Sequence, residues 1–507
     1  MGTKDENNYH SDISKIAKNA GITGLGEIIF NLLAYVTSII ITRTVGPAIF
    51  GVFNLANNVT NTAQILSNSG PGHGLLRFVA YYKGKGDTPR LKGAIIFGTK
   101  VSFSLSLFFT VILFYSADYI SINFFHNRDV GKAIKILLIS LPFLTLGNIW
   151  LDCIQSFQII KYQVYSNKII QPVTRLTCLA IFFLMGLKLA GILAASIIST
   201  LVGFSFILYY LLKIFPVFKK LPHPVYEKKE IINFSLPISL AQYLGIITLY
   251  ADSFMLGYFK NTSDVGIYVA AVKFAMLIEL PLISFNTILG PMISEFYAKN
   301  EMRQLEELFK VVTKWVFALS LPLFLIFVLF AKPIMGIFGE GFVVGAIALI
   351  IFGGAELINA GTGASGQIIT MTGRPIINTL NALIFGILNI ILNFILIPKY
   401  GIYGASIATG SSIAIINILK VVQVYFFLRI HPYNLNYLKP FIAGLLSFLI
   451  VFTITYNLVS IPLFTTALLT ILFLGLYSFF IYLFKLEKED TYVLQLIYQK
   501  LMSIPKA

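Results

Sequence analysis

Long apolar runs separated by short polar connections follow one another along almost the whole chain. A helix needs about 20 mainly apolar residues to cross the hydrocarbon core of a bilayer, and fourteen runs in this sequence have that character. They lie at approximately 22–42, 50–75, 93–117, 132–152, 165–186, 189–211, 233–257, 264–290, 309–330, 342–360, 375–396, 401–424, 437–457 and 461–484. The pattern predicts an all-α integral membrane protein with about fourteen transmembrane helices and without a separate soluble domain.

The composition leads to the same class of protein. Hydrophobic residues make up 57% of the 507 residues, charged residues make up 12%, and the mean hydropathy is +0.82. Because ordinary soluble domains contain about 25% charged residues, a soluble fold is excluded. Cys153 and Cys178 are the only cysteines, and both lie in apolar runs. A disulfide-rich secreted scaffold is therefore excluded as well.

The formal net charge of +16 has two interpretations, which are nucleic-acid binding and positively charged cytoplasmic loops. Most lysines and arginines fall in the terminal segments and in every second loop, including Arg77, Lys83, Lys85, Arg90 and Lys92. We therefore predict a multi-pass protein of the cell membrane with both termini in the cytoplasm and no nucleic-acid partner. Since residues 1–20 are polar, we expect no cleavable signal peptide, and the first apolar helix would act as the membrane signal.

An internal repeat divides the chain. A constant shift places Gly51, Phe53, Ala56 and Tyr82 on Gly266, Tyr268, Ala271 and Tyr297. A similar shift aligns GILAASIIS at 191–199 with GIYGASIAT at 401–409. Because an even number of predicted helices separates the copies, both have the same orientation in the membrane, as in transporters whose central site lies between two lobes.

The repeat and the charge pattern together predict five parts of the chain. These are a cytoplasmic tail (1–20), an N-terminal lobe of six helices (21–215), a C-terminal lobe of six helices (230–430), a terminal helix pair (436–485) and a cytoplasmic tail (486–507). In the last part, Leu494, Ile497, Tyr498 and Leu501 repeat at helical spacing. This spacing predicts a short amphipathic helix on the inner membrane surface.

Polar side chains form stripes on the first two predicted helices. In the second helix the stripe consists of Asn54, Asn57, Asn61, Gln64 and Asn68, and the first helix carries a similar stripe that includes Glu27. One or two such groups would be explained by hydrogen bonds between helices. Two stripes on neighbouring helices favour a water-filled cavity. The sequence Ser69-Gly-Pro-Gly-His-Gly74 then interrupts the second helix, either as a simple kink or as backbone that lines the cavity.

Ionisable side chains within the predicted spans are the strongest indications of a functional site, because each costs about 2.5–3.5 kcal/mol at a helix centre. They are Glu27, Lys100, Arg175, Asp252, Lys273, Glu279 and Glu356. Snorkelling toward the membrane surface would explain Lys100, and also Lys420, which lies near a helix end. Arg175 and Lys273 lie deeper, which favours a role in the cavity.

Several segments resemble a known family. ITRTVGPAIFGVFNLANNV at 41–59 and GLLRFVAYY at 74–82 resemble the start of Wzx-type polysaccharide flippases, which belong to the superfamily of the MATE drug exporters and the lipid II flippase MurJ. YADSFMLGYFKNTSDVGIYVAAVKF at 250–274 and PKYGIYGASIAT at 398–409 resemble later segments of the same family. The chain departs from the family at Tyr81, where an acidic residue is usual.

The resemblance implies that the protein flips a polyprenyl-diphosphate-linked oligosaccharide across the membrane by alternating access between two lobes, without covalent chemistry. A MATE-like cation-coupled multidrug exporter is the alternative. The chain contains no HExxH, P-loop or Gly-x-Ser-x-Gly motif, so we do not expect an enzyme. We also predict that it needs no metal or cofactor and works as a monomer, near glycosyltransferases or a polymerase.

A diphosphate substrate requires cationic partners, for which arginine offers a planar fork and lysine a point charge. The predicted substrate-binding residues are Arg77, Lys100, Arg175, Lys273, Asn57 and Asn61. The predicted ion-coupling residues are Asp252, Glu356 and Glu27, with H⁺ or Na⁺ as the coupling ion. A carboxylate of this kind biases alternating access if it binds the ion in only one conformation. Alternatively, Asp252 only pairs with Lys273, whereas no partner is evident for Glu356.

Overall fold

A computed structural model describes residues 2–68, 72–215, 223–456 and 462–484. All regular structure in these residues is helical, and eleven helices are long and apolar enough to cross a membrane. The prediction of an all-α, multi-pass membrane protein is therefore confirmed. The whole of the predicted C-terminal tail, 486–507, lies outside the described residues, and with it the predicted amphipathic helix.

The predicted count of fourteen transmembrane helices is not confirmed. The first two apolar runs both lie in α1 (Gly2–Asn68), where the non-helical backbone of Gly46, with a φ of 73°, separates two helical segments. The runs at 165–186 and 233–257 lie on helices, but those helices are not among the eleven. The predicted interruption at 69–74 includes residues outside the described part of the chain; α1 ends at Asn68, and α2 begins at Gly72.

The chain divides into two compact units, Met1–Gly266 (unit 1) and Ile267–Ala507 (unit 2). The lobe boundaries that the repeat predicts, 21–215 and 230–430, remain a prediction, as do the tail at 1–20 and the terminal pair at 436–485. The helices of unit 1 after α1 are α2 (Gly72–Gly84), α3 (Thr88–Asn123), α4 (Arg128–Leu137), η1 (Leu138–Ser140), α5 (Leu141–Ser156), α6 (Lys161–Gln163), η2 (Val164–Ile170), α7 (Gln171–Leu184), α8 (Leu189–Ile214) and α9 (Lys228–Phe259).

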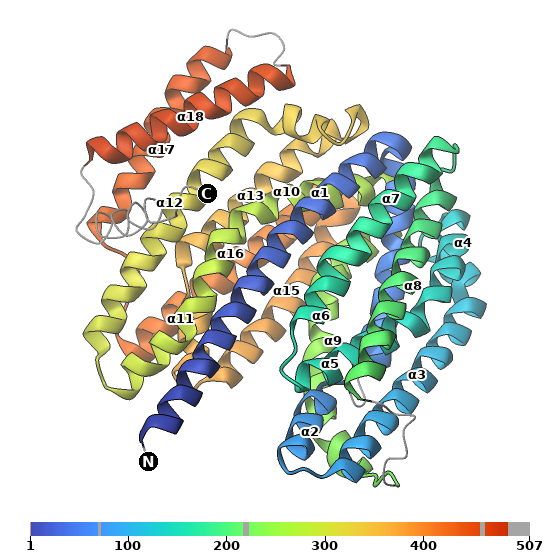
Figure 1. Cartoon of the computed structure of the whole chain (residues 1–507). Helices are drawn as coiled ribbons and strands as arrows, with labels where there is room; N and C mark the ends of the chain where they lie inside the picture. The colour runs from blue at the N-terminus through green and yellow to red at the C-terminus, as the bar shows by residue number, and fades with distance from the viewer. Residues whose placement is uncertain (1, 69–71, 216–222, 457–461, 485–507) are drawn as a thin grey trace, which may run out of the picture. The chain divides into compact units, whose positions relative to one another are not determined.

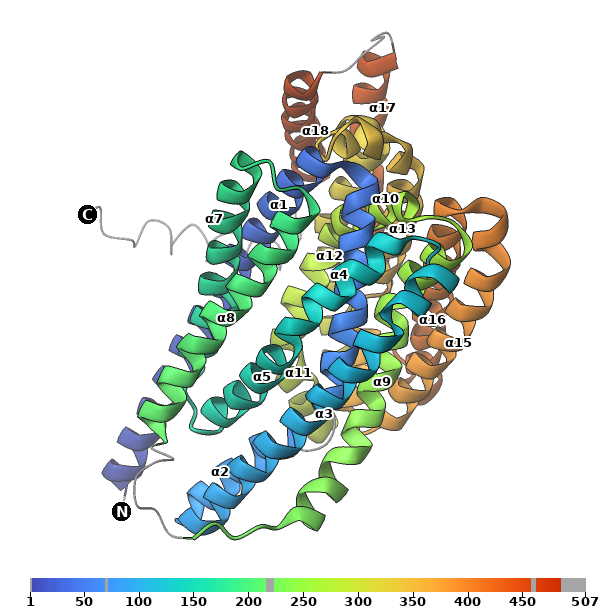
Figure 2. The same cartoon turned by 90° about the vertical axis from the view of Figure 1, so that its right-hand side faces the viewer.

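An apolar core of unit 1 lies where α2, α3, α5 and α8 meet. Leu75 of α2, Ile149 of α5 and Ile207 of α8 are almost completely buried there. Figure 2 shows α7 and α8 side by side, and these two helices are in extensive contact. The segment η2 is a π-helix, a conformation that occurs frequently at functional sites.

Helix α10 (Thr262–Ala275) begins in unit 1 and continues into unit 2. The other helices of unit 2 are η3 (Met276–Glu279), α11 (Leu280–Ala298), α12 (Met302–Gly336), η4 (Glu340–Gly345), α13 (Ala346–Thr362), α14 (Ser365–Met371), α15 (Pro375–Tyr400), α16 (Ile402–Leu428), η5 (Leu435–Tyr437), α17 (Leu438–Tyr456) and α18 (Leu463–Leu483). Figure 1 shows α17 and α18 side by side, and both pack against α12.

Local sequence explains where several of these helices end. Asn127 caps α4, because its side chain accepts a hydrogen bond from the backbone N–H of Asp129 at 3.0 Å. Gly401 separates α15 from α16 with a φ of 57°, which is readily accessible to glycine. These residues divide long apolar stretches into separate helices of membrane-spanning length.

The two repeat copies touch each other at equivalent residues. An alanine side chain at Gly51 of α1 would overlap the backbone oxygen of Thr262, and one at Gly266 of α10 would overlap the backbone oxygen of Pro47. The same shift that relates Gly51 to Gly266 also relates Pro47 to Thr262. Such a reciprocal contact is typical of two elements related by a twofold axis. The contact supports the internal repeat and requires glycine on both helices.

Residues 223–227 lie against the N-terminal end of α3. The backbone N–H of Val225 donates to the backbone oxygen of Pro89 at 3.1 Å, and Arg90 Nε donates to Glu227 Oε1 at 3.0 Å. Arg90 also donates to Asp87, the N-cap of α3. These contacts hold the segment before α9 on unit 1.

We expect the start of α3 to loosen in acid. The backbone N–H of Arg90, followed by its side chain, holds the pKa of Asp87 below its usual range. Because the pKa is lower in the folded than in the unfolded protein, this contribution to stability is present above the unfolded pKa and is lost as the pH falls through the folded pKa. Hydrogen exchange at residues 88–91, corrected for the intrinsic rate, should show the loss of protection. Asp87→Asn keeps the capping oxygen but cannot ionise, so an undiminished pH response in this variant would contradict the prediction.

Candidate functional site

The amide stripe on α1 forms a partly accessible face. Asn57 and Asn61 are partly buried, whereas Leu55 and Ala56, which come just before Asn57, are fully buried. A side-chain hydrogen bond joins Asn61 to Tyr250 on α9. The two asparagines therefore lie on a different side of α1 from its apolar packing surface, and α9 borders this side.

Arg175 on α7 lies beside the same stripe. Its guanidinium carbon is 5.2 Å from the centre of the Phe53 ring, and Phe53 is one helical turn from Asn57 on α1. The Nε atom of Arg175 is shielded from solvent and has no hydrogen-bond partner among the described residues. The structure thus brings together two predicted substrate-binding residues and leaves a buried cationic donor unused.

A second cationic side chain contacts the N-terminal half of α1. Lys168 in the π-helix η2 forms an ion pair with Glu27 at 2.8 Å, and its Nζ lies 4.4 Å from the centre of the Phe30 ring. Gly26 allows this approach, because an alanine there would overlap Val164 of η2. Glu27, a predicted ion-coupling residue, therefore already has a cationic partner.

Arg77 and Lys100 are both exposed. The Arg77 guanidinium on α2 lies over the ring of Phe234 on α9, 4.2 Å from its centre. Lys100 on α3 makes no hydrogen bond or ion pair within the described part of the chain. Neither of these cations is joined to Arg175 by a contact.

Asp252 on α9 is buried, with 7% of its surface exposed. Lys273 is partly buried on α10 and belongs to the other unit. The alternative prediction that these two residues pair with each other remains a prediction.

Glu356 on α13 is buried and has a partner, which the sequence did not reveal. The amide nitrogen of Asn359 donates to Glu356 Oε2 at 3.1 Å and to Glu279 Oε1 at 3.5 Å. Lys420 on α16 interacts electrostatically with Glu279 and donates to Asn417 Oδ1 at 3.3 Å. Lys420 is thus part of a polar network rather than only a lysine that snorkels to the membrane surface.

Other amides in unit 2 serve to join helices. Asn381 on α15 and Gln423 on α16 exchange two hydrogen bonds of 2.7 and 2.9 Å. Asn389 on α15 donates to Thr409 Oγ1 on α16 at 2.7 Å. These groups are satisfied within the protein, so they stabilise helix packing.

Two ionisable residues were missed in the sequence. Asp152 is partly buried on α5 and shares one helix face with Asn148 and Gln155. The predicted helix ended at this position, whereas α5 continues to Ser156. Lys168 was missed because it lies at the start of an apolar run, although its spacing to Gln171 and Arg175 places all three on one face.

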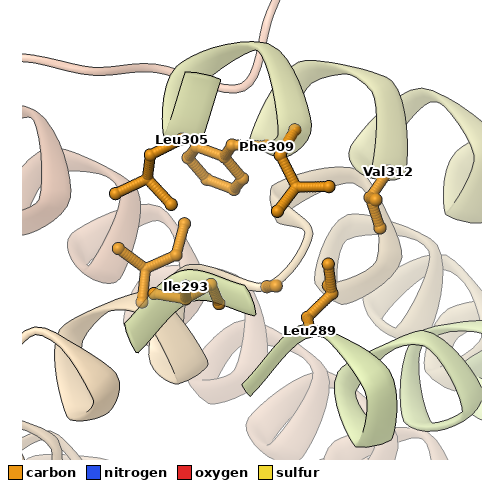
Figure 3. A pocket seen from close by; sticks show the side chains of 8 residues that line it. Leu289, Ile293, Leu305, Phe309 and Val312 are labelled. Atoms are coloured by element: carbon orange, nitrogen blue, oxygen red, sulfur yellow. The ribbon is translucent and has the colours of Figure 1, made fainter. Parts of the chain in front are cut away.

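The pocket in Figure 3 has no polar lining. Leu289 and Ile293 of α11 face Leu305, Phe309 and Val312 of α12 across it. A sugar or a diphosphate requires hydrogen-bonding partners, so this pocket is part of the apolar core. Among the described residues, no group of three histidine, cysteine or acidic side chains could hold a metal ion.

Comparisons with known proteins agree with this arrangement. Residues 16–297 match the family described as "Polysaccharide biosynthesis protein", and residues 237–395 match the MatE family. The first of these matches covers more than half of the chain.

Two relatives extend the comparison. The "Probable low-salt glycan biosynthesis flippase Agl15" of Haloferax volcanii is 28% identical over 192 residues, which are 38% of this chain and 41% of the relative. The "Uncharacterized membrane protein MJ1068" of Methanocaldococcus jannaschii is 24% identical over 397 residues, which are 74% of this chain and 77% of the relative. The match to the flippase thus covers less than half of its length.

The fold is that of a solved transporter. The structure titled "Lipid II flippase MurJ, inward closed conformation" aligns with a TM-score of 0.73 at 15% sequence identity. The alignment covers 91% of this chain and 98% of that chain. At this identity the likeness establishes the fold.

Proposed function

The chain belongs to the polysaccharide biosynthesis protein family, and on this premise we propose that it flips a polyprenyl-diphosphate-linked oligosaccharide across the cell membrane. The oligosaccharide is used to assemble a surface polysaccharide or a glycoprotein glycan. Transport proceeds by alternating access between two lobes and involves no covalent chemistry.

Arg175 is the observation that carries the proposal. Arg175 is partly buried, and its Nε is shielded from water without an acceptor among the described residues. A shielded donor without a partner costs about 1–3 kcal/mol, and more when the group is charged. The ring of Phe53 offsets only part of this cost. An anionic diphosphate would supply the missing acceptor. Asn57 and Asn61, one and two helical turns beyond Phe53 on α1, would bind sugar hydroxyls.

The remaining predicted residues have supporting roles in this proposal. Arg77 and Lys100 are accessible cations that attract the diphosphate, and Lys273 is a further cation for it. Asp252, Glu356 and Glu27 couple transport to a gradient of H⁺ or Na⁺. For Glu27, this requires the Lys168 ion pair to open during the transport cycle.

The proposal includes a topology and a setting in the cell. Both termini lie in the cytoplasm, because the lysine and arginine residues concentrate in the terminal segments and alternate loops. The protein acts as a monomer, close to the glycosyltransferases or the polymerase that handle the same glycan.

A MATE-like exporter of drugs, coupled to cations, is the second candidate function. The match of residues 237–395 to the MatE family and the buried Glu356 favour it. It differs from the first candidate because its substrates are not lipid-linked, so the two candidates are separated by which molecule accumulates when the protein is missing.

Depletion of the protein should leave lipid-linked oligosaccharide on the cytoplasmic leaflet. Intact cells and inverted membrane vesicles are each treated with a membrane-impermeant oxidant or lectin. The lipid-linked glycan is then extracted, and the fraction that reacted in intact cells is compared with the fraction that reacted in inverted vesicles. We expect this accessible fraction to fall several-fold, and to recover when the wild-type gene is restored. Normal surface glycan together with increased drug sensitivity would instead support the exporter.

A further inference from the structure

Two carboxylates and one lysine of unit 2 belong to a single network, in which Glu356 is buried and the other members are partly buried. Asn359 links them, because its amide nitrogen donates to Glu356 on α13 and to Glu279 at the end of η3. Lys420 on α16 interacts electrostatically with Glu279, and Glu279 does so with Glu356. We call Glu279, Glu356 and Lys420, together with Asn359, the α13 network.

The charges of the α13 network do not cancel. If every group is ionised, two negative charges face one positive charge, so one negative charge is left over. Glu356 is only 4% exposed. An uncompensated charge in such a place costs several kcal/mol, and two neighbouring carboxylates repel each other. One bound proton removes both costs and makes the network neutral.

Other charged residues near α13 leave this balance unchanged. On α12, the residues that face α13 on either side of Glu356 are apolar: Phe317 lies beside Gly361 and Phe324 beside Gly353. The nearest charged residue on α12 is Lys314, about one helical turn before Phe317. Glu340 in η4 is exposed. The groups that act on the Glu356 carboxylate are Glu279 and Asn359.

We propose that the α13 network is a binding site for one proton, and that the charge of Lys420 sets this number. The proton is held while the network is closed off from water, and it leaves when transport exposes the network. The inference rests on the proposed transport function, because proton binding is coupled to transport only if the network opens and closes during the transport cycle. Lys420 is a positioning residue here, because it acts through Glu279.

Charge balance gives each variant a different number of protons. Glu279→Gln leaves one carboxylate and one ammonium, so this variant needs no proton. Lys420→Met leaves two carboxylates and needs two protons. The double variant Glu279→Gln with Lys420→Met leaves one carboxylate and again needs one proton.

Proton uptake by the purified protein tests the inference without any transport. The protein in detergent is titrated between pH 9 and pH 5 with a pH-indicator dye, and bound protons per chain are compared among the variants. We expect Glu279→Gln to bind one proton fewer than wild type, Lys420→Met one more, and the double variant the same number as wild type. Glu340→Gln is the matched control, because it removes an exposed carboxylate outside the network.

A transport measurement then links the site to coupling. Vesicles containing a polyprenyl-diphosphate disaccharide are given a pH gradient, and the gradient should accelerate flipping in wild type and in the double variant but not in Glu279→Gln. A double variant that behaves like Glu279→Gln in both assays would overturn the inference, because a merely structural role cannot be rescued by removing Lys420. Absence of flipping in wild type, with the expected proton numbers, would overturn the proposed function but leave the proton site in place.

Discussion

Arg175→Met is expected to reduce glycan flipping roughly 10- to 100-fold, because each charge-assisted hydrogen bond to the diphosphate contributes about 1.5–3 kcal/mol. The same change should leave the thermal midpoint of unfolding unchanged or raise it. Arg175 Nε has no partner among the described residues, so its burial destabilises the empty protein. Methionine has a similar length, is apolar, and can still pack on Phe53. A substitution that reduces transport but stabilises the protein indicates that Arg175 serves to bind the substrate rather than to stabilise the fold.

Flipping in reconstituted vesicles and the thermal midpoint in detergent are the two measurements. Lys188→Met is the matched control, since it removes one exposed cation from the turn between α7 and α8. We expect the control to flip substrate at the wild-type rate. If Arg175→Met retains flipping, the guanidinium has a structural role and the diphosphate binds elsewhere. A strongly lowered midpoint would also count against the proposed role.

Gly51→Ala and Gly266→Ala are each expected to destabilise the protein by at least about 1–3 kcal/mol, the usual range for overpacking. At both positions the added methyl group would overlap a backbone carbonyl oxygen. A carbonyl cannot rotate away as a side chain can, so α1 and α10 would have to separate. Because the contact is reciprocal, the two substitutions should have effects of similar size. Flipping should fall as well, since the two helices can no longer approach closely.

Thermal unfolding of the purified variants measures this effect. Gly386→Ala in α15 is the control, because no atom lies within 4 Å of the added methyl group. Alanine has the higher helix propensity, so this control should be as stable as wild type or slightly more stable. An unchanged midpoint in Gly51→Ala or Gly266→Ala would show that the close contact between α1 and α10 is not required for stability.

The distribution of apolar residues was sufficient to predict the membrane class and most helices, but not their number. The runs 22–42 and 50–75 lie on either side of Gly46, whose non-helical backbone divides α1 into two helical segments, as two separate runs predict. The run at 165–186 instead is divided between η2 and α7, neither of which is among the eleven helices of membrane-spanning length. A run of apolar residues does not record such a division. The repeat was similarly visible as a shift between Gly51 and Gly266, although the contact between these two residues was not.

The candidate site was predicted in part. The spacing of Asn57 and Asn61 indicated a polar face of a helix, and the depth of Arg175 in its apolar run indicated a functional charge. The ion pair between Glu27 and Lys168 could not be predicted, because these residues are far apart in the sequence and only the π-helix η2 brings them together.

Hydropathy, charge distribution and spacing are properties of short segments, and for this protein they sufficed to identify lipid as its surroundings, helix as its structure and transport as its class of function. Which intramembrane charges have partners was decided only when the helices packed. Glu356 had no evident partner in the sequence, yet Asn359 and Glu279 surround it in unit 2. Arg175 could have been expected to pair, yet its Nε has no partner within the described residues. The physical reason is that the energy of a buried charge depends on groups within a few ångströms in space, and chain packing alone determines which groups those are.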